Sequence, residues 1–157
     1  MSDISTMPGH LIRRFHQATV AILQKEVSVL GYDLTPVQYA VLNKINNNPG
    51  IDQITLAGLI AYDRTTITSV VDRLEQRGWV TREVSNQDRR SKVIKLTTEG
   101  VKVLCKVTPA VISAQAIMLQ GLEAKESEVF LSLLEKATDA VNELSRAPLK
   151  KSKDDKN

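Results

Sequence analysis

Apolar side chains recur every three to four residues along most of this chain, which is the spacing of a helix that buries one face. Within residues 51–100 this pattern changes from two short helical segments to alternation with a period of two. The first of these helices is predicted to start after Asp52, a good N-cap, and the second after the break at 62–63. Gly78 lies where a glycine commonly ends a helix, so the second helix is predicted to stop there.

The two short helices have the apolar spacing of a helix-turn-helix, with Ala57 at the point where the helices touch. The tight turn between them favours glycine, and this chain has Ala61 there. The inward positions are Leu56, Ile60, Ile67 and Val70. The outward face of the second helix consists of Arg64, Thr65, Thr68, Ser69, Asp72 and Arg73, with Thr66 at its edge. Short polar side chains and arginines suit a DNA major groove, so we interpret this helix as a recognition helix.

Two segments rich in β-branched residues follow, at 79–85 and 91–97, and both alternate with a period of two. The residues between them form a polar tip that includes Arg89 and Arg90. A two-stranded ribbon with a cationic tip beside a recognition helix is a wing. The alternative is a solvated hairpin in an unrelated α+β domain, and the preceding helix-turn-helix favours the wing.

Longer helices are predicted around this lobe, at about 8–31, 36–46, 98–119 and 124–145. Pro109 lies inside the third of them and should kink it. The outer helices carry more apolar surface than a small lobe can cover, which predicts a homodimer joined by helices. The predicted fold is mainly α with a small β-hairpin wing, as one domain. Its parts are a winged helix-turn-helix lobe at about 35–100, dimerisation helices at about 8–31 and 98–146, and a disordered tail at 147–157.

The charge distribution supports a nucleic-acid partner more than the net charge does. The whole chain carries a formal charge of only +3, but residues 64–95 contain eight cations against four anions. Positive charge therefore gathers on the predicted DNA-reading element, as it should on a surface that meets phosphates. The predicted DNA contacts are Arg64, Thr65, Thr66, Thr68, Ser69, Arg73, Arg89, Arg90 and Lys92. Asp72 is predicted to pair with an arginine rather than contact a base.

Several function classes find no support in the sequence. It contains no phosphate-binding loop, no nucleophile–base pair and no metal-ligand cluster, so neither an enzyme nor a cofactor is expected. The single cysteine, Cys105, lies on a predicted apolar stripe with Val101, Leu104, Val111 and Ile112, so a buried and inert thiol is expected. No apolar leader and no run of membrane-spanning length is apparent, which predicts a cytoplasmic protein without a membrane partner.

The wing carries a spacing that resembles a known family. Asp88, Arg90, Leu96, Thr97 and Gly100 match the D-x-R-x5-L-T-x2-G signature of the MarR family of bacterial transcription regulators. Residues 71–80 are similar to that family's run from recognition helix to wing, and the resemblance spans nearly the whole chain. It implies a two-fold dimer, joined by its terminal helices, that presents two winged helices to a pseudo-palindromic operator in double-stranded DNA.

The start of the first long helix carries a second candidate site. His10, Arg13, Arg14 and His16 form a cationic cluster, in which His10 and Arg14 share a helix face. Spacing alone leaves open whether these residues hold a carboxylate ligand, form ion pairs between chains or face solvent. Residues 8–14 and 34–39 resemble the MarR subgroup that controls catabolism of hydroxycinnamates, benzoate-type acids and nicotinate. That resemblance implies a small aromatic carboxylate effector, with His10, Arg14, Gln38 and Tyr39 as its candidate ligands.

These observations predict a homodimeric winged helix-turn-helix repressor of an aromatic-acid catabolic operon of the hydroxycinnamate type. An aromatic carboxylate is expected to release it from its operator. Two alternatives remain at this point. One is a regulator that senses redox state through Cys105, and the other is a winged-helix module that binds protein instead of DNA.

Overall fold

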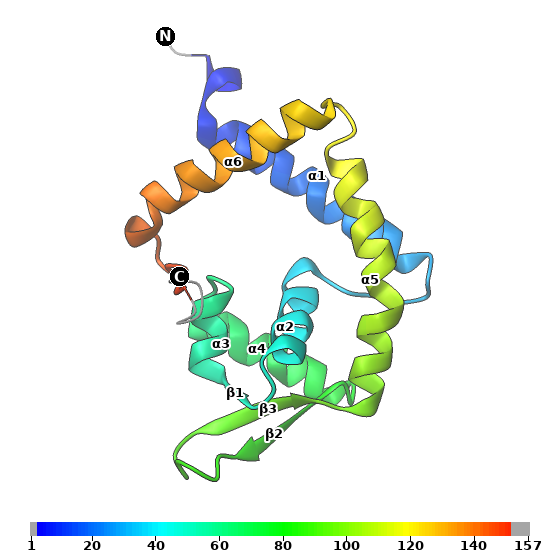
Figure 1. The fold of residues 1–157 in the computed structure, drawn as a ribbon, viewed down its shortest axis with the longest axis vertical. Coiled ribbons are helices and arrows are strands. Elements are labelled where there is room, and N and C mark those ends of the chain that lie inside the picture. Colours follow the sequence, from blue (N-terminus) through cyan, green and yellow to red (C-terminus); the bar gives the residue numbers. More distant parts are fainter. Residues whose placement is uncertain (1–2, 152–157) are drawn as a thin grey trace.

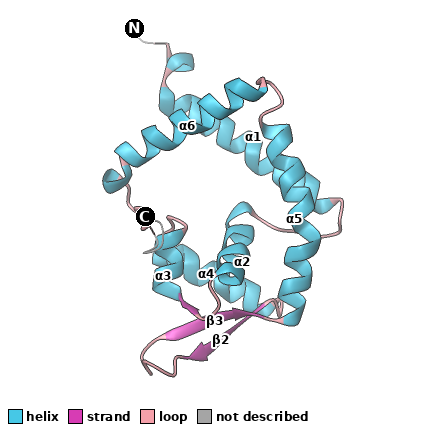
Figure 2. Ribbon diagram, viewed as in Figure 1, coloured by secondary structure: helices cyan, strands magenta, loops and turns pink. Residues whose placement is uncertain are grey.

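The computed structural model describes residues 3–151, and its elements are arranged in a ring (Figure 1). The helices are α1 (Pro8–Ser28), α2 (Pro36–Asn47), α3 (Gln53–Leu59), α4 (Arg64–Gln76), α5 (Thr98–Met118) and α6 (Ala124–Ala140). The strands are β1 (Ile51–Asp52), β2 (Val80–Val84) and β3 (Lys92–Leu96), and short 3-10 turns cover Ile4–Thr6 and Asn142–Leu144. Helices predominate and the strands gather at one end (Figure 2), which confirms the mainly α fold with a small wing.

The helices of the lobe begin where side chains cap their first backbone N–H groups. Asp52 accepts a hydrogen bond from the backbone N of Thr55 at 2.9 Å, and Asp63 accepts one from the backbone N of Thr66 at 2.9 Å. Ala61, in the turn between α3 and α4, has a φ of 55°, in the left-handed region that favours glycine. The predicted tight turn is therefore present at the predicted position.

The wing is part of a three-stranded antiparallel sheet with the order β1-β3-β2. The sequence predicted only the two long strands, and the short strand β1 is an addition. In β1, Ile51 pairs with Ile94 of β3, and both side chains are buried. This pairing ties the base of the wing to the start of α3, because β1 leads directly into that helix. The core beside it consists of Leu34, Leu42, Ile45, Leu56, Ile67, Leu74 and Ile94, all fully buried.

Thr97 joins the wing to α5. Its hydroxyl accepts a hydrogen bond from the backbone N of Gly100 at 3.0 Å and donates one to the carbonyl O of Gly78 at 2.6 Å. Its backbone N donates to the carbonyl O of Trp79 at 3.0 Å. Gly100 packs so closely here that a Cβ would lie 2.0 Å from the Trp79 carbonyl O. The L-T-x2-G part of the signature is thus the joint between recognition helix, wing and α5.

Helix α5 buries a face that overlaps the predicted one only in part, since Leu104 and Val111 are buried as predicted. Its buried side chains are Val103, Leu104, Val107, Val111 and Ala114. Cys105 is exposed, so the prediction of a buried thiol is wrong for this protomer, and Val101 and Ile112 are exposed as well. The helix itself continues through Pro109 without interruption. The helix is also long and apolar enough to cross a membrane by length and composition alone, contrary to the prediction, yet one face of it packs in the lobe core.

Helices α1 and α6, with the C-terminal end of α5, form the part of the ring away from the wing (Figure 1). Helix α1 packs along α5, and Ser113 of α5 donates a hydrogen bond to Glu26 of α1 at 3.1 Å. Helix α6 meets α1 through an edge-to-face contact between Phe15 and Phe130, whose ring centroids are 5.6 Å apart. No residue of α6 is buried in the protomer. Apolar side chains exposed on α1 and α6 include Leu11, Ile12, Val129, Leu131 and Leu133.

The start of the predicted disordered tail is ordered. Residues 147–151 are described and contact both α6 and α3, so this part of the prediction is wrong. Tertiary contacts hold this segment in place: Asn142 makes two hydrogen bonds to the backbone of Leu149, and the backbone N of Lys150 donates to the carbonyl O of Gly58 in α3. The remaining tail prediction, for 152–157, lies outside the described residues.

Candidate nucleic-acid interface

Helix α4 presents the predicted polar face to solvent. Arg64, Thr65, Thr68, Ser69 and Arg73 are exposed, while Ile67, Val70, Val71 and Leu74 on the opposite side are buried. Thr66 is half-buried, and its hydroxyl donates to the Asp63 carboxylate at 2.8 Å, so it takes part in the helix cap. The hydrogen bonds from the backbone and side chain of Thr66, with the nearby Arg146, hold the pKa of Asp63 below its ordinary value. The cap is therefore charged at neutral pH.

Ion pairs divide the eight cations of residues 64–95 into two groups. Arg77 pairs with Asp33 at 3.7 Å, Arg82 pairs with Asp72 and Glu75, and Lys95 pairs with Glu83 at 2.8 Å. The other five cations have no ion-pair partner among residues 3–151, and they are Arg64, Arg73, Arg89, Arg90 and Lys92. All five were predicted DNA contacts. Three of the four acidic side chains of this region take part in these ion pairs, and the fourth, Asp88, accepts the backbone N of Arg90. Within the described part of the chain, five unpaired cations therefore stand against one unpaired carboxylate, so the free charge is mainly positive.

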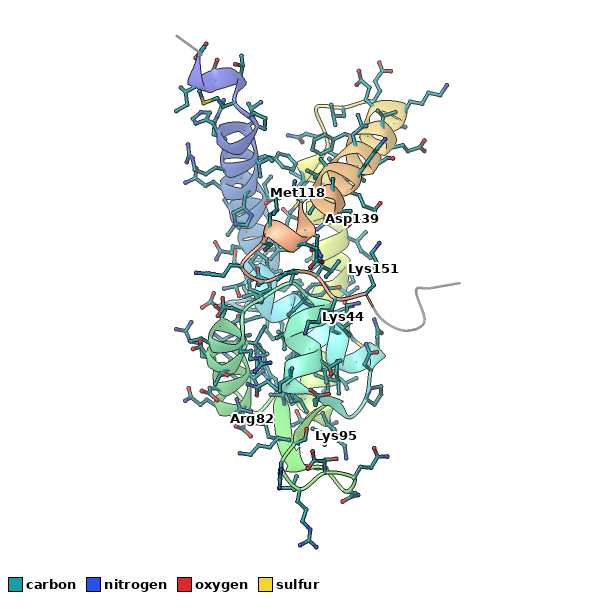
Figure 3. The ribbon with its side chains drawn as sticks, turned by 90° about the vertical axis from the view of Figure 1, so that its left-hand side faces the viewer. Lys44, Arg82, Lys95, Met118, Asp139 and Lys151 are labelled. Carbon is teal, nitrogen blue, oxygen red and sulfur yellow. The ribbon has the colours of Figure 1, made fainter. Side chains whose placement is uncertain are left out.

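Arg82 has a structural role at this surface that the sequence did not indicate. It lies on β2 and reaches α4, where its guanidinium bonds to the carboxylates of Asp72 and Glu75 and to the carbonyl O of Thr68. Its side chain is only 16% exposed, so this group is largely screened from solvent. These bonds hold the wing strand on the recognition helix, and Figure 3 labels Arg82 at the wing end of the lobe. It also supplies the arginine partner predicted for Asp72, a partner that sequence spacing could not identify.

The wing tip is a polar turn that projects its arginines. The Ser85 hydroxyl accepts hydrogen bonds from the backbone N of Gln87 and of Asp88, at 3.2 and 3.3 Å. The Asp88 carboxylate accepts the backbone N of Arg90 at 2.9 Å. Asp88 therefore shapes the turn through the backbone, and the guanidinium of Arg90 is exposed and available to a phosphate or a minor groove.

A cavity of about 570 Å³ lies between α1, α5 and α6. Its walls are mostly apolar and include Phe15, Met118, Leu119 and Phe130, and His16 is the ionisable side chain among them. The Thr19 hydroxyl is a second polar group in the lining, and a concave apolar space with a few polar groups has the character of a site for a small aromatic molecule. The predicted ligands His10 and Arg14 are not part of this lining. Arg14 precedes His16 by two residues, which turns it to the other side of α1, and it is exposed.

The two predicted ligands on α2 have partners inside the lobe. Gln38 is buried, and its side-chain Oε1 accepts the backbone N of Thr35 at 3.0 Å in a capping box. Tyr39 is half-buried, and its hydroxyl lies 3.4 Å from the hydroxyl of Thr108 on α5. Since Thr108 donates to the carbonyl O of Leu104, Tyr39 is the donor in that pair. One protomer thus does not bring the four predicted ligands together in the cavity.

Known proteins share this arrangement over most of the chain. The model of the MarR family matches residues 34–92. The transcriptional regulator HosA of Escherichia coli O127:H6 is 36% identical over 127 residues, which cover 81% of this chain and 91% of HosA. The crystal structure of PcaV from Streptomyces coelicolor with its natural ligand has a TM-score of 0.83 and 36% identity, and the match covers 90% of this chain and 98% of PcaV.

A third match is relevant to the interface described above. A mutant of E. coli MarR in complex with operator DNA has a TM-score of 0.79 and 29% identity, and the match covers 87% of this chain and 99% of that one. Family model, full-length relatives and structures all agree with the winged helix-turn-helix built from these residues. The chain therefore belongs to the MarR family of transcriptional regulators.

Proposed function

We propose that this protein is a homodimeric repressor of an aromatic-acid catabolic operon, and that a small aromatic carboxylate of the hydroxycinnamate type releases it from its operator. The observation that carries the DNA-binding part is the separation of charges. Arg64 and Arg73 on α4, with Arg89, Arg90 and Lys92 at the wing, are the cations of residues 64–95 left without an ion-pair partner among residues 3–151. Unpaired cations on the recognition helix and on the wing that follows it can bind the phosphates of a DNA backbone.

Double-stranded DNA with a pseudo-palindromic site is the partner that fits two such lobes. A two-fold dimer presents two recognition helices, and each half-site of a palindrome receives one of them. The exposed apolar side chains of α1 and α6 support the dimer, because they are unpaired in the protomer. We place the protein in the cytoplasm, where the operator is.

The wing is tested by Arg90→Ala. We expect this variant to bind the operator about 1–3 kcal/mol more weakly and to show a shallower dependence of affinity on salt, because one phosphate contact is lost. Lys95→Ala is the matched control, since Lys95 already pairs with Glu83 on the outer side of the wing. Both are measured by fluorescence anisotropy with an operator duplex at several salt concentrations. Equal affinity and equal salt slope for Arg90→Ala and wild type would remove the wing from the mechanism.

The effector is proposed from the cavity and from the chemistry of the cationic helix. An aromatic ring needs apolar walls, and its carboxylate needs a cation or hydrogen-bond donors to offset desolvation. We propose that Arg14 and His10 supply the charge, and that the start of α2, where Gln38 is buried and Tyr39 is half-buried, borders the aromatic ring. Because Arg14 faces away from the cavity of its own protomer, this site requires the second protomer to complete it.

Arg14→Ala tests this anchor. The variant is expected to keep operator affinity and to lose release by hydroxycinnamate or benzoate-type acids, because the bidentate guanidinium contact to the carboxylate is gone. The measurement is a pair of DNA titrations, without and with the acid, on wild type, Arg14→Ala and His16→Ala. Release at the wild-type acid concentration by Arg14→Ala, together with loss of release by His16→Ala, would move the anchor into the cavity described above. Loss of DNA binding by Arg14→Ala would instead give Arg14 a role in the dimer.

A further inference from the structure

The segment from Ser145 to Lys151 connects the end of the dimerisation region to the DNA-binding lobe, and we call it the strap. Asn142, in the 3-10 turn before the strap, bonds to Leu149 near the end of the strap: its Nδ2 donates to the carbonyl O of Leu149 at 3.1 Å, and its Oδ1 accepts the backbone N of Leu149 at 2.8 Å. These two bonds fix the turn of the strap against the end of α6. Lys151 adds an ion pair to Asp139 of α6 at 3.1 Å.

The other side of the strap rests on α3. The backbone N of Lys150 donates to the carbonyl O of Gly58 at 2.9 Å. The aliphatic part of the Lys150 side chain covers Gly58 so closely that a Cβ on Gly58 would lie 2.9 Å from the Lys150 Cδ. Arg146 reaches Asp63, the N-cap of the recognition helix, at 3.6 Å. The strap therefore touches the first helix of the helix-turn-helix and the cap of the second.

These contacts close the ring that Figure 1 shows. The lobe is connected to the dimerisation helices on one side by α5, which is continuous from the wing, and by the α1–α2 connection. The strap adds a second attachment, at the C-terminal end of α3. A lobe held only at α5 can swing about that helix, whereas a lobe held at two separate places cannot swing without breaking the Lys150–Gly58 bond or bending the strap.

We propose that the strap is a positioning element that sets the spacing between the two recognition helices of the dimer, and so determines the half-site spacing that the protein accepts. This inference rests on the proposed DNA-binding function. In a dimer the separation of the two α4 helices follows from the orientation of each lobe relative to the dimerisation helices. A fixed orientation lowers the entropy lost on binding a matching site, and it penalises a site with the wrong spacing.

Two variants at Lys150 separate the effect of its backbone bond to Gly58 from the effect of its side chain. Lys150→Pro removes the N–H that bonds Gly58, while Lys150→Ala removes the same positive charge and keeps that N–H. Asn142→Ala removes both bonds to Leu149 and should act in the same direction as Lys150→Pro. None of these residues belongs to the proposed DNA-contacting face. Circular dichroism and size-exclusion chromatography first establish that each full-length variant is folded and dimeric.

The probe is a duplex that wild-type protein selects from a random DNA pool, together with versions of it in which one base pair is inserted or removed between the half-sites. We expect wild type and Lys150→Ala to lose about 10-fold or more in affinity on either change of spacing. Lys150→Pro and Asn142→Ala should lose less than about 3-fold on the same changes and bind the selected duplex about 3- to 10-fold more weakly than wild type.

Each other result contradicts the proposal in an identifiable way. If Lys150→Pro discriminates spacing as wild type does, the strap does not position the lobe. If Lys150→Ala behaves like Lys150→Pro, the lysine side chain acts and the backbone bond to Gly58 does not. Loss of the dimer in both Lys150→Pro and Asn142→Ala would make the strap part of the subunit interface instead. If wild type selects no duplex at all, the proposed DNA-binding function fails, and the strap inference with it.

Discussion

Gly100→Ala should destabilise the protein by about 3 kcal/mol, because a well-packed backbone junction has no room for the added methyl group. The new Cβ would lie 2.0 Å from the carbonyl O of Trp79 and 2.9 Å from its carbonyl C. Neither atom is the end of a flexible side chain, so the backbone itself must move. That movement would break the bond from the Thr97 backbone N to the same carbonyl and loosen the contact between wing and α5.

The measurement is urea unfolding at one protein concentration, followed by the fluorescence of Trp79, the single tryptophan of the chain. Gly9→Ala is the matched control, since a Cβ at Gly9 meets nothing within 4 Å and the position lies in the first turn of α1. Alanine is the better helix former, so this control should be neutral or slightly stabilising. An unfolding midpoint for Gly100→Ala equal to that of Gly9→Ala would contradict the tight junction.

Leu133→Asp should produce a folded monomer that has lost tight operator binding. Leu133 lies on α6, which buries no residue in the protomer, and its side chain is 59% exposed there. The substitution therefore leaves the lobe core intact. In the proposed dimer it would place an unpaired carboxylate in an apolar interface, which is strongly unfavourable. A monomer holds only one half-site, so operator affinity should fall about 100-fold or more.

Light scattering measures the mass, circular dichroism the helix content and anisotropy the operator affinity. Ser132→Asp is the control because it adds the same charge at the neighbouring exposed position, on the side of α6 away from the apolar stripe. It should remain dimeric. A dimeric Leu133→Asp with wild-type affinity would show that the interface lies on other helices.

Much of the lobe could be predicted because its signals are local. The cap Asp52, the turn residue Ala61 and Gly78 act within a few residues of their own positions in the chain, so sequence spacing places them. The polar face of α4 follows from the 3.6-residue period once the buried side is known. Sequence alone likewise indicated that the positive charge gathers on the wing and recognition helix.

Other features depended on which surfaces meet. Helix α5 is apolar on more than one face, so its period could not show that Val107 is buried and Cys105 exposed. The short strand β1 exists only because β3 lies beside it. Arg82 is ten residues from Asp72 in the chain, and only the packing of β2 against α4 makes them partners.

The family, the helix-turn-helix lobe and the cations proposed to contact DNA could be read from the sequence alone. Tertiary structure decided which of those cations remain free, because Arg77, Arg82 and Lys95 find carboxylates through contacts that spacing does not encode. It also decided that His16 lines the cavity and that residues 147–151 form an ordered strap. All these cases have the same cause. Helix caps and helical periods depend on residues that are close in the chain, whereas ion pairs and side-chain burial depend on segments that are distant in the chain.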